Sequence, residues 1–209
     1  MAQRRQRLTR AEQQAETRSR LLDAAIKVFS KRGLHEATVE EISEAAGYSR
    51  GAVYSNFAGK EELLLCVFEE RIEPRLRDLA GPMIEAGSAR EQAEASRRLL
   101  HLLLTQERAY LQLLLEFWGF AARNPRVGRR FAEVRRRRRA MIENMILERL
   151  ERRDGSGGPP PDLLAGGFVA MTVGVLFEAL VDPELDAEAI QALLFEAVSR
   201  SAGQEARRS

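Results

Sequence analysis

The chain has 209 residues, of which 44% are hydrophobic and 31% are charged, and its formal net charge at pH 7 is +2. This balance excludes a disordered polyelectrolyte and is typical of a soluble protein with a sizeable core. Because the net charge is nearly neutral, any argument for a nucleic-acid partner must come from local features. The single cysteine, Cys66, lies in an apolar run and allows no internal disulfide, which indicates a buried thiol in a reducing compartment.

The beginning of the chain is basic. Residues 1–10 hold four arginines and no acid, so we expect residues 1–16 to form a flexible arm that either lies along DNA phosphates or serves as a solubilising tail. No apolar signal segment follows it. The uncharged stretch Leu163–Phe177 is shorter than the roughly 20 residues that a membrane-spanning helix needs. We therefore expect a fully buried helix there, no membrane partner and a cytoplasmic protein.

Helical periodicity begins soon after the arm. A first helix is expected over 17–32, because apolar residues recur at helical spacing and Gly33 stands where a left-handed residue would end it. A second helix is expected over 38–46. It opens with Thr38 and Glu41, the spacing of a capping box.

A short third helix is expected over 50–56, with Ser49 as its N-cap. Two helices joined by a short turn that contains a glycine, here Gly47, form a helix-turn-helix, whose second helix enters the major groove of DNA. Val53 and Phe57, four residues apart, would anchor the short helix from below. The other side chains of this helix then face outward.

These outward-facing residues are suited to contact DNA. Arg50 can donate two hydrogen bonds to guanine, and Ala52 can meet a thymine methyl group. Thr38 and Lys60 each lie at a helix N-terminus, where free backbone N–H groups attract phosphate. The predicted DNA-binding residues are Thr38, Ser49, Arg50, Gly51, Ala52, Tyr54, Ser55, Asn56 and Lys60.

The stretch TVEEISEAAGYSRGAVYSNFAGKEELL, residues 38–64, resembles the signature of the tetracycline-repressor-like (TetR) family of bacterial one-component regulators. Three residues depart from the family's commonest ones: Ser43 replaces alanine, Tyr48 replaces valine and Asn56 replaces histidine. The first two affect packing, whereas Asn56 can still donate to phosphate but carries no charge. The matching elements are Thr38, Ile42, Ala46-Gly47, Ser49, Gly51, Val53-Tyr54, Phe57 and Lys60-Glu61.

The rest of the chain is also helical in pattern, without strand alternation. A helix from Lys60 to about residue 80 should kink or end at Pro74. The Gly/Ser/Pro run over 154–161 predicts a loop. Further helices are expected over 88–105, 107–122, 127–153, 162–181 and 186–201.

The predicted fold class is all-α. It comprises a basic flexible arm over 1–16, a three-helix helix-turn-helix DNA-binding domain over 17–59, a helical ligand-binding and dimerisation domain over 60–201, and a tail over 202–209.

The resemblance implies a homodimer whose C-terminal helices pair in a four-helix bundle. Two stripes of small or apolar residues near the end of the chain agree with this, although the alternative is that they close the monomer's own core. A two-fold dimer would place its two DNA-reading helices roughly 34–36 Å apart, matching a palindromic operator. The predicted interface residues are Gly166, Ala170 and Gly174 on one helix and Ile190, Leu193, Leu194, Ala197 and Val198 on the next.

The resemblance also implies a ligand pocket in the larger domain. Aromatic and flexible apolar residues of the middle helices would suit a hydrophobic or aromatic effector, with His101 or Glu178 fixing its orientation. For each of these residues ordinary core packing is the alternative. The candidates are His101, Tyr110, Phe117, Trp118, Met141, Met145, Phe168, Met171, Phe177 and Glu178.

Five consecutive arginines occupy Arg135–Arg139. On a helix their side chains point in directions about 100° apart, so they cannot form one DNA-facing stripe. We interpret them as solvated or paired with acids such as Glu133 and Glu143. A regulatory or anion-binding role is the alternative.

The sequence therefore predicts a ligand-responsive DNA-binding transcriptional regulator, a repressor that a small effector releases from its operator. The alternative is a constitutive helix-turn-helix DNA-binding protein without a small-molecule effector. An enzyme is not expected, because His35 and His101 lack metal-ligand spacing and no nucleophile or phosphate-loop motif occurs. For the same reason we expect neither a cofactor nor a metal ion.

Overall fold

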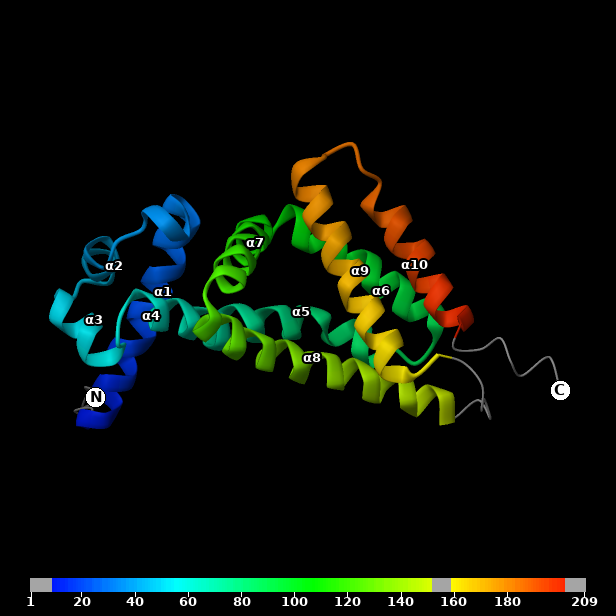
Figure 1. Cartoon of the computed structure of the whole chain (residues 1–209), viewed down its shortest axis with the longest axis horizontal. Helices are drawn as coiled ribbons and strands as arrows, with labels where there is room; N and C mark the ends of the chain where they lie inside the picture. The colour runs from blue at the N-terminus through cyan, green and yellow to red at the C-terminus, as the bar shows by residue number, and fades with distance from the viewer. Residues whose placement is uncertain (1–8, 152–158, 202–209) are drawn as a thin grey trace, which may run out of the picture. The chain divides into compact units, whose positions relative to one another are not determined.

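A computed structural model describes residues 9–151 and 159–201, and every regular element within these ranges is a helix (Figure 1). The all-α fold class is thereby confirmed. The predicted tail and much of the predicted loop at 154–161 lie outside the described residues. The chain divides into two compact units, one ending at Glu73 and the other beginning at Pro74.

Five helical elements make up the N-terminal unit. They are α1 (Arg10–Glu36), α2 (Val39–Ala46), α3 (Arg50–Asn56), α4 (Lys60–Val67) and the π-helical turn η1 (Phe68–Ile72). Helix α1 packs against α2, α3 and α4. Apolar side chains at helical spacing bring these helices together, because each buries a stripe that would otherwise face water. The most buried members of this core are Leu21, Leu22, Ala25, Phe29, Ile42, Val53, Leu63, Val67, Phe68 and Ile72.

Helix α1 begins at Arg10, not near residue 17, so the prediction of a flexible arm was wrong for residues 9–16. The reason is a capping box that we overlooked. The Thr9 hydroxyl accepts the Glu12 backbone N–H, and the Glu12 carboxylate accepts the Thr9 backbone N–H at 2.7 Å. These two bonds satisfy donors that the first helical turn leaves free. Residues 1–8 lie outside the described residues.

The far end of α1 agrees with the prediction only in part. Gly33 interrupts the helix with a φ of 79°, in the region that favours glycine, but its ψ of 164° is not left-handed helical, and helical structure resumes as far as Glu36. Leu34 follows and is buried, as is Phe29 in the last regular turn of the helix.

The chain stays helical from Lys60 through α4, η1 and α5 (Glu73–Glu85), so the helix does not end at Pro74, one of the two outcomes that we predicted there. The π turn η1 directly precedes this proline, and the Glu73 N–H bonds to the Phe68 carbonyl, five residues back. Proline in a helix clashes with the carbonyl four residues earlier and lacks a donor. A turn with hydrogen bonds five residues apart relieves this conflict, which explains why the helix continues.

The boundary between the units also differs from our prediction. We placed residue 60 onward in the second domain, but α4 and η1 belong to the first unit. Their residues Leu63, Val67 and Phe68 are almost fully buried, and α4 packs against α1. Burial of this apolar face therefore decides the boundary.

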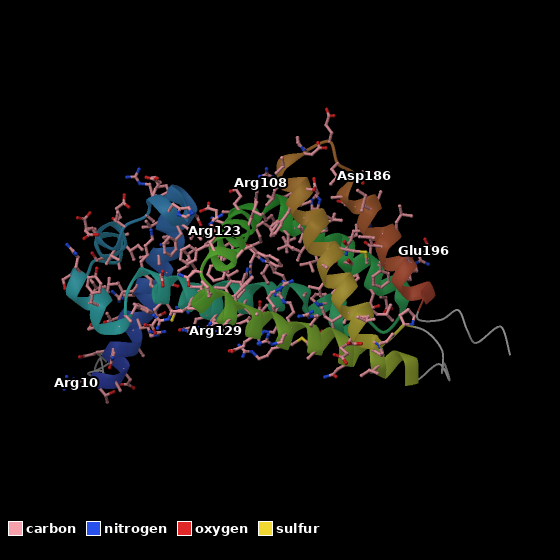
Figure 2. The ribbon with its side chains drawn as sticks, in the orientation of Figure 1. Arg10, Arg108, Arg123, Arg129, Asp186 and Glu196 are labelled. Atoms are coloured by element: carbon pink, nitrogen blue, oxygen red, sulfur yellow. The ribbon has the colours of Figure 1, made fainter. Side chains whose placement is uncertain are left out.

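The second unit is a helical bundle (Figure 1). Its helix α5 runs to Glu85, about five residues beyond the predicted end, whereas the described ends of the later helices lie within one or two residues of the predicted ones. Asp186, labelled in Figure 2, caps the last helix by accepting the Ala189 N–H at 2.9 Å. Arg108, also labelled there, donates to the Leu180 carbonyl at 2.8 Å. After α5 the helices are α6 (Ala89–Thr105), α7 (Arg108–Arg123), α8 (Pro125–Glu151), α9 (Pro161–Val181) and α10 (Ala187–Ser201).

Helix α9 lies against α6, α7, α8 and α10. We predicted that it would be fully buried, but it is not. Leu164, Ala165 and Phe168 face the core, whereas Leu163 and Val181 are 64% and 79% exposed. Among the described residues, α9 is the helix that is long and apolar enough to cross a membrane, a property that core helices of soluble proteins share. One side of it is packed and the other is open.

Candidate nucleic-acid interface

Helix α3 is held against the rest of its unit from beneath. Val53 and Phe57 are 0% and 2% exposed, as their four-residue spacing predicted. The Ser49 hydroxyl caps the helix by accepting the Ala52 N–H at 3.4 Å. Gly47 ends α2 with a φ of 74°, so the turn requires the left-handed conformation there. The sequence thus builds a short helix with one buried and one open side.

The open side carries the residues that we predicted to contact DNA. Arg50, Gly51 and Ser55 are exposed, and Tyr54 is 52% exposed. Ala52 and Asn56 are half-buried at the edge of this surface, and Ser49 is exposed. We call α3 the reading helix. The DNA contacts themselves remain predictions, but the structure leaves the side chains of Arg50, Tyr54 and Ser55 largely open to solvent.

Arg50 has a neighbour that sequence reasoning missed. One of its guanidinium nitrogens lies 2.8 Å from a carboxylate oxygen of Glu40, and both side chains are largely exposed. An exposed pair of this kind contributes at most about 1 kcal/mol, so a guanine edge or a phosphate can replace the carboxylate. The pair holds the guanidinium beside the first turn of α2.

Ser55 and Asn56 currently bond to their own helix. The Ser55 hydroxyl donates to the Ala52 carbonyl at 3.0 Å, and the Asn56 side-chain amide donates to the same carbonyl at 2.8 Å. Such bonds to the preceding turn are common for short polar side chains. The same amide nitrogen also donates to the Ser55 hydroxyl at 3.3 Å, so the phosphate contact predicted for Asn56 requires it to give up one of these two bonds.

The N-terminus of α2 is less open to phosphate than we expected. The Thr38 hydroxyl accepts the Glu41 N–H at 3.2 Å, and the Glu41 carboxylate accepts the Thr38 N–H at 3.0 Å. Arg32 also donates to this carboxylate, at 2.8 Å. Hydrogen bonding from the Thr38 backbone, assisted by Arg32, lowers the pKa of Glu41. The capping box was correctly predicted, but it occupies the Thr38 N–H that we expected to be free.

Lys60 is likewise occupied. Its ammonium group donates to the His35 carbonyl at 3.0 Å and so ties the start of α4 to the end of α1. Burial lowers the pKa of Lys60, and the negative charges of Glu36 and Glu41 oppose that effect. The structure gives Lys60 a tie within the unit, and its phosphate contact remains a prediction.

In the second unit, some of the predicted pocket residues meet inside and others do not. Phe117 and Phe168 are buried, and Tyr110, Met171 and Phe177 are half-buried. His101, Met141 and Glu178 are exposed, and the His101 ring lies 3.3 Å from the Glu188 carboxylate. These three side chains therefore do not face the interior. The prediction was wrong for them because helical spacing alone does not show which helix covers which face. The side chain of Met145 lies outside the described residues.

The interior aromatic residues form a cluster around Trp118. Its ring lies edge-on to Phe131 at 5.4 Å and to Phe177 at 6.0 Å between centroids. The Arg135 guanidinium lies over the same ring, 4.8 Å from its centroid. Arg135, the first of the five arginines, therefore packs over an aromatic ring, a contact that we did not predict.

Sequence reasoning missed a buried polar group between α6, α9 and α10. The Gln191 amide nitrogen donates to the Ser96 hydroxyl at 3.2 Å and to the Thr172 hydroxyl at 3.0 Å. Among the described residues, the buried Gln191 carbonyl oxygen and the buried Trp118 indole N–H find no hydrogen-bond partner. The signal in the sequence was one glutamine within the apolar stripe of the last helix. Within the described residues, no three His, Cys, Asp or Glu side chains lie together in a way that could hold a metal ion.

The predicted dimer residues lie mostly on an open surface. Ala170, Gly174 and Ala197 are exposed, and Leu193 is 63% exposed. Gly166, Ile190 and Leu194 are half-buried, and the side chain of Val198 lies outside the described residues. The monomer's own core therefore leaves much of this stripe uncovered.

Comparison with known proteins identifies the family of the chain. The family model "Bacterial regulatory proteins, tetR family" matches residues 21–67, and "BetI-type transcriptional repressor, C-terminal" matches residues 89–203, more than half of the chain. SrpR, a transcriptional regulator of Pseudomonas putida, is 48% identical over 59 residues. This match spans 28% of the chain and 28% of SrpR.

Solved structures share the fold over most of the chain. FadR of Bacillus subtilis in complex with stearoyl-CoA has a TM-score of 0.71 at 19% identity, covering 86% of this chain and 96% of FadR. The SmeT–triclosan complex has a TM-score of 0.67 at 23% identity, covering 88% and 90%; SmeT represses a multidrug efflux pump of Stenotrophomonas maltophilia. The chain therefore belongs to the TetR family of transcriptional regulators, with a DNA-binding helix-turn-helix in its N-terminal unit.

Proposed function

We propose that the protein is a cytoplasmic repressor that binds a palindromic operator as a homodimer and leaves it when a small hydrophobic or aromatic effector binds. The observation that carries the DNA-binding part is the construction of the reading helix. Two buried residues, Val53 and Phe57, hold it, while its polar side faces outward.

On the operator, Arg50 would exchange Glu40 for a guanine edge, since its guanidinium can donate two parallel hydrogen bonds there. Tyr54 and Ser55 offer hydroxyl groups to phosphates or base edges. Gly51 carries no side chain and allows the backbone to approach the groove closely.

The dimer is supported by the open stripe on α9 and α10. Leu193, Ala170 and Gly174 present apolar or small groups to solvent, and a second copy would cover the same residues of its partner. Small residues on α9 would let a partner helix approach closely. Two copies would supply two reading helices for the two halves of a palindrome.

The effector class is supported by the interior of the second unit. The ring cluster of Trp118, Phe131 and Phe177 is apolar, and in the described part of the chain the buried Trp118 N–H and the buried Gln191 carbonyl oxygen have no hydrogen-bond partner. An unpaired buried polar group costs about 1–3 kcal/mol, which a ligand with a matching group would recover. We infer an apolar molecule with a hydrogen-bond acceptor, a donor or both. The related structures with stearoyl-CoA and triclosan support an apolar effector of this kind.

Release from DNA requires the effector to bind one state of the dimer better than the other. Coupling of this kind is typically about 1–3 kcal/mol. An effector that favours the state with misplaced reading helices would therefore weaken operator binding by about fivefold to 150-fold.

The test begins with selection of duplexes from a random pool by the wild-type protein, followed by gel-shift titration. Selection of a palindrome supports the operator proposal, and failure to enrich any sequence would sink it. Thermal melting with triclosan, long-chain acyl-CoA and unrelated apolar compounds then tests the effector, because a ligand of the folded state raises the Tm. If none raises the Tm or weakens DNA binding, the constitutive DNA-binding alternative holds.

A further inference from the structure

Arg18 joins three elements of the N-terminal unit through the contacts of its single guanidinium group. Nη1 donates to the Asn56 backbone carbonyl at 3.1 Å. Nη2 donates to the Cys66 sulfur at 3.1 Å and to the Glu70 carboxylate at 2.6 Å. The guanidinium carbon also lies 4.5 Å from the centroid of the Phe57 ring. These partners belong to the end of α3, to α4 and to η1.

The contact with Asn56 meets a specific need of the reading helix. The last carbonyls of a helix have no partner within the helix, and this end carries partial negative charge. In α3 the final residue is Asn56, and Phe57 then turns the chain into an extended conformation. Arg18 places a positive charge and a donor at this carbonyl, and packs over the residue that anchors α3.

Glu70 holds Arg18 from the opposite side. The hydrogen bond to its carboxylate is the largest influence that raises the pKa of Arg18, and it orients the guanidinium fork. Glu70 belongs to η1, so Arg18 links this π turn to the end of α3. The side chain of Arg18 is 32% exposed, and three of its five N–H groups donate within the unit.

We propose that Arg18 is a positioning residue: held by Glu70, it sets the orientation of the reading helix that specific DNA recognition requires, without itself contacting DNA. This inference rests on the proposed function, in which α3 reads base sequence. It adds Arg18 and Glu70, two residues outside the helix-turn-helix, to the determinants of specificity.

The test compares specific with non-specific DNA. The probes are a duplex that the wild-type protein selects from a random pool and a scrambled duplex of equal length. Arg18→Met keeps an unbranched apolar stem but removes the guanidinium, and Glu70→Gln weakens its hold. Arg20→Met is the matched control, because Arg20 lies on the same helix, is exposed and pairs with Glu16 one turn away.

We expect Arg18→Met to lower affinity for the selected duplex about tenfold or more, and Glu70→Gln to lower it in the same direction by less. Affinity for the scrambled duplex and its salt dependence should not change, since phosphate contacts set both. Arg20→Met should change neither affinity. In the double variant that combines Arg18→Met with Glu70→Gln, affinity for the selected duplex should fall by less than the product of the two single fold-changes, because both substitutions act on the same contact.

Several outcomes would overturn the inference. If the salt dependence of DNA binding by Arg18→Met corresponds to about one phosphate contact fewer than in the wild type, Arg18 binds phosphate directly. Equal losses on both duplexes would show a general structural role, and unchanged affinity for the selected duplex would show no role. If Arg18→Met does not fold, Arg18→Lys and Glu70→Gln provide the same comparison, because Lys keeps the charge but loses the fork. If wild-type protein selects no duplex, the proposed function fails first.

Discussion

The two units of the protein differ in where they leave polar and apolar groups. In the N-terminal unit a core of apolar side chains is buried, and polar groups such as Thr38, Glu41 and Arg32 bond to one another. In the second unit Leu163, Val181 and Leu193 are exposed, while the buried carbonyl oxygen of Gln191 finds no partner among the described residues. Buried polar groups without a partner are rare in folded proteins, and contiguous apolar patches on the surface often mark interaction sites.

This difference distinguishes a surface that one chain forms by itself from surfaces that, we propose, a second copy or an effector covers. The reading helix needs only its own unit to be correctly placed. The open stripe on α9 and α10 and the unpaired groups around Gln191 and Trp118 each indicate something to be added, which we propose are a second copy and an effector. The following predictions test this contrast, beginning with the largest effect.

Removal of a buried side chain that anchors the reading helix should cause the largest loss of stability. Phe57→Ala deletes a buried ring that lies beneath the reading helix, and such truncations cost about 3–5 kcal/mol. Chemical denaturation should show this loss, together with weaker binding to a selected duplex. Tyr54→Ala, on the open side of the same helix, should change the free energy of unfolding by no more than about 0.5 kcal/mol. Equal losses in both variants would contradict the division of α3 into two sides.

A charge on the open stripe should separate the two copies. Leu193→Glu places a carboxylate where a partner helix would bury it, and we expect the dimer to weaken by at least about 2 kcal/mol, roughly thirtyfold in its dissociation constant. Sedimentation measures the change, and the monomer should stay folded because Leu193 is exposed. Leu115→Glu alters an exposed leucine on α7 and should leave the dimer intact. Dissociation by both variants, or by neither, would move the interface elsewhere.

Loss of the guanidinium from the reading helix should weaken recognition of sequence. Arg50→Ala should reduce affinity for a selected duplex by about 1–3 kcal/mol, the contribution of a bidentate contact with guanine. The fold should survive because the side chain is exposed. Glu40→Gln frees Arg50 from its partner and should leave affinity unchanged or raise it. Gel-shift titration decides, and full affinity in Arg50→Ala would remove this residue from the reading surface.

The smallest effect concerns pH. Because hydrogen bonds lower the pKa of Glu41 in the folded protein, its ionised form stabilises the fold. This contribution is present above the ordinary glutamate pKa and is lost as pH falls through the lowered one. Denaturation of Glu41→Gln should therefore show less loss of stability on acidification than the wild type. Glu44→Gln, an exposed change on the same helix, should behave like the wild type, and a reversed order would contradict the capping role of Glu41.

Local patterns in the sequence determined much of the N-terminal unit. The Thr38 capping box, the left-handed Gly47 and the buried pair Val53 and Phe57 were all predicted correctly. Each depends on hydrogen bonds or side-chain spacing within about four residues, which sequence displays directly. The start of α1 at Thr9 was also readable in this way, but the basic residues beside it led us to predict an arm.

Tertiary structure alone decided which face of each later helix is covered. It placed His101 and Glu178 on the surface, brought Gln191 to Ser96 across 95 positions of sequence, and set Arg18 between Asn56 and Glu70. Helical periodicity shows that a stripe will be buried but not against which helix, because that depends on packing among segments far apart in the chain. The exposed side of α3 could therefore be derived from local sequence, whereas the contacts of Arg18 and the uncovered groups of the second unit could not.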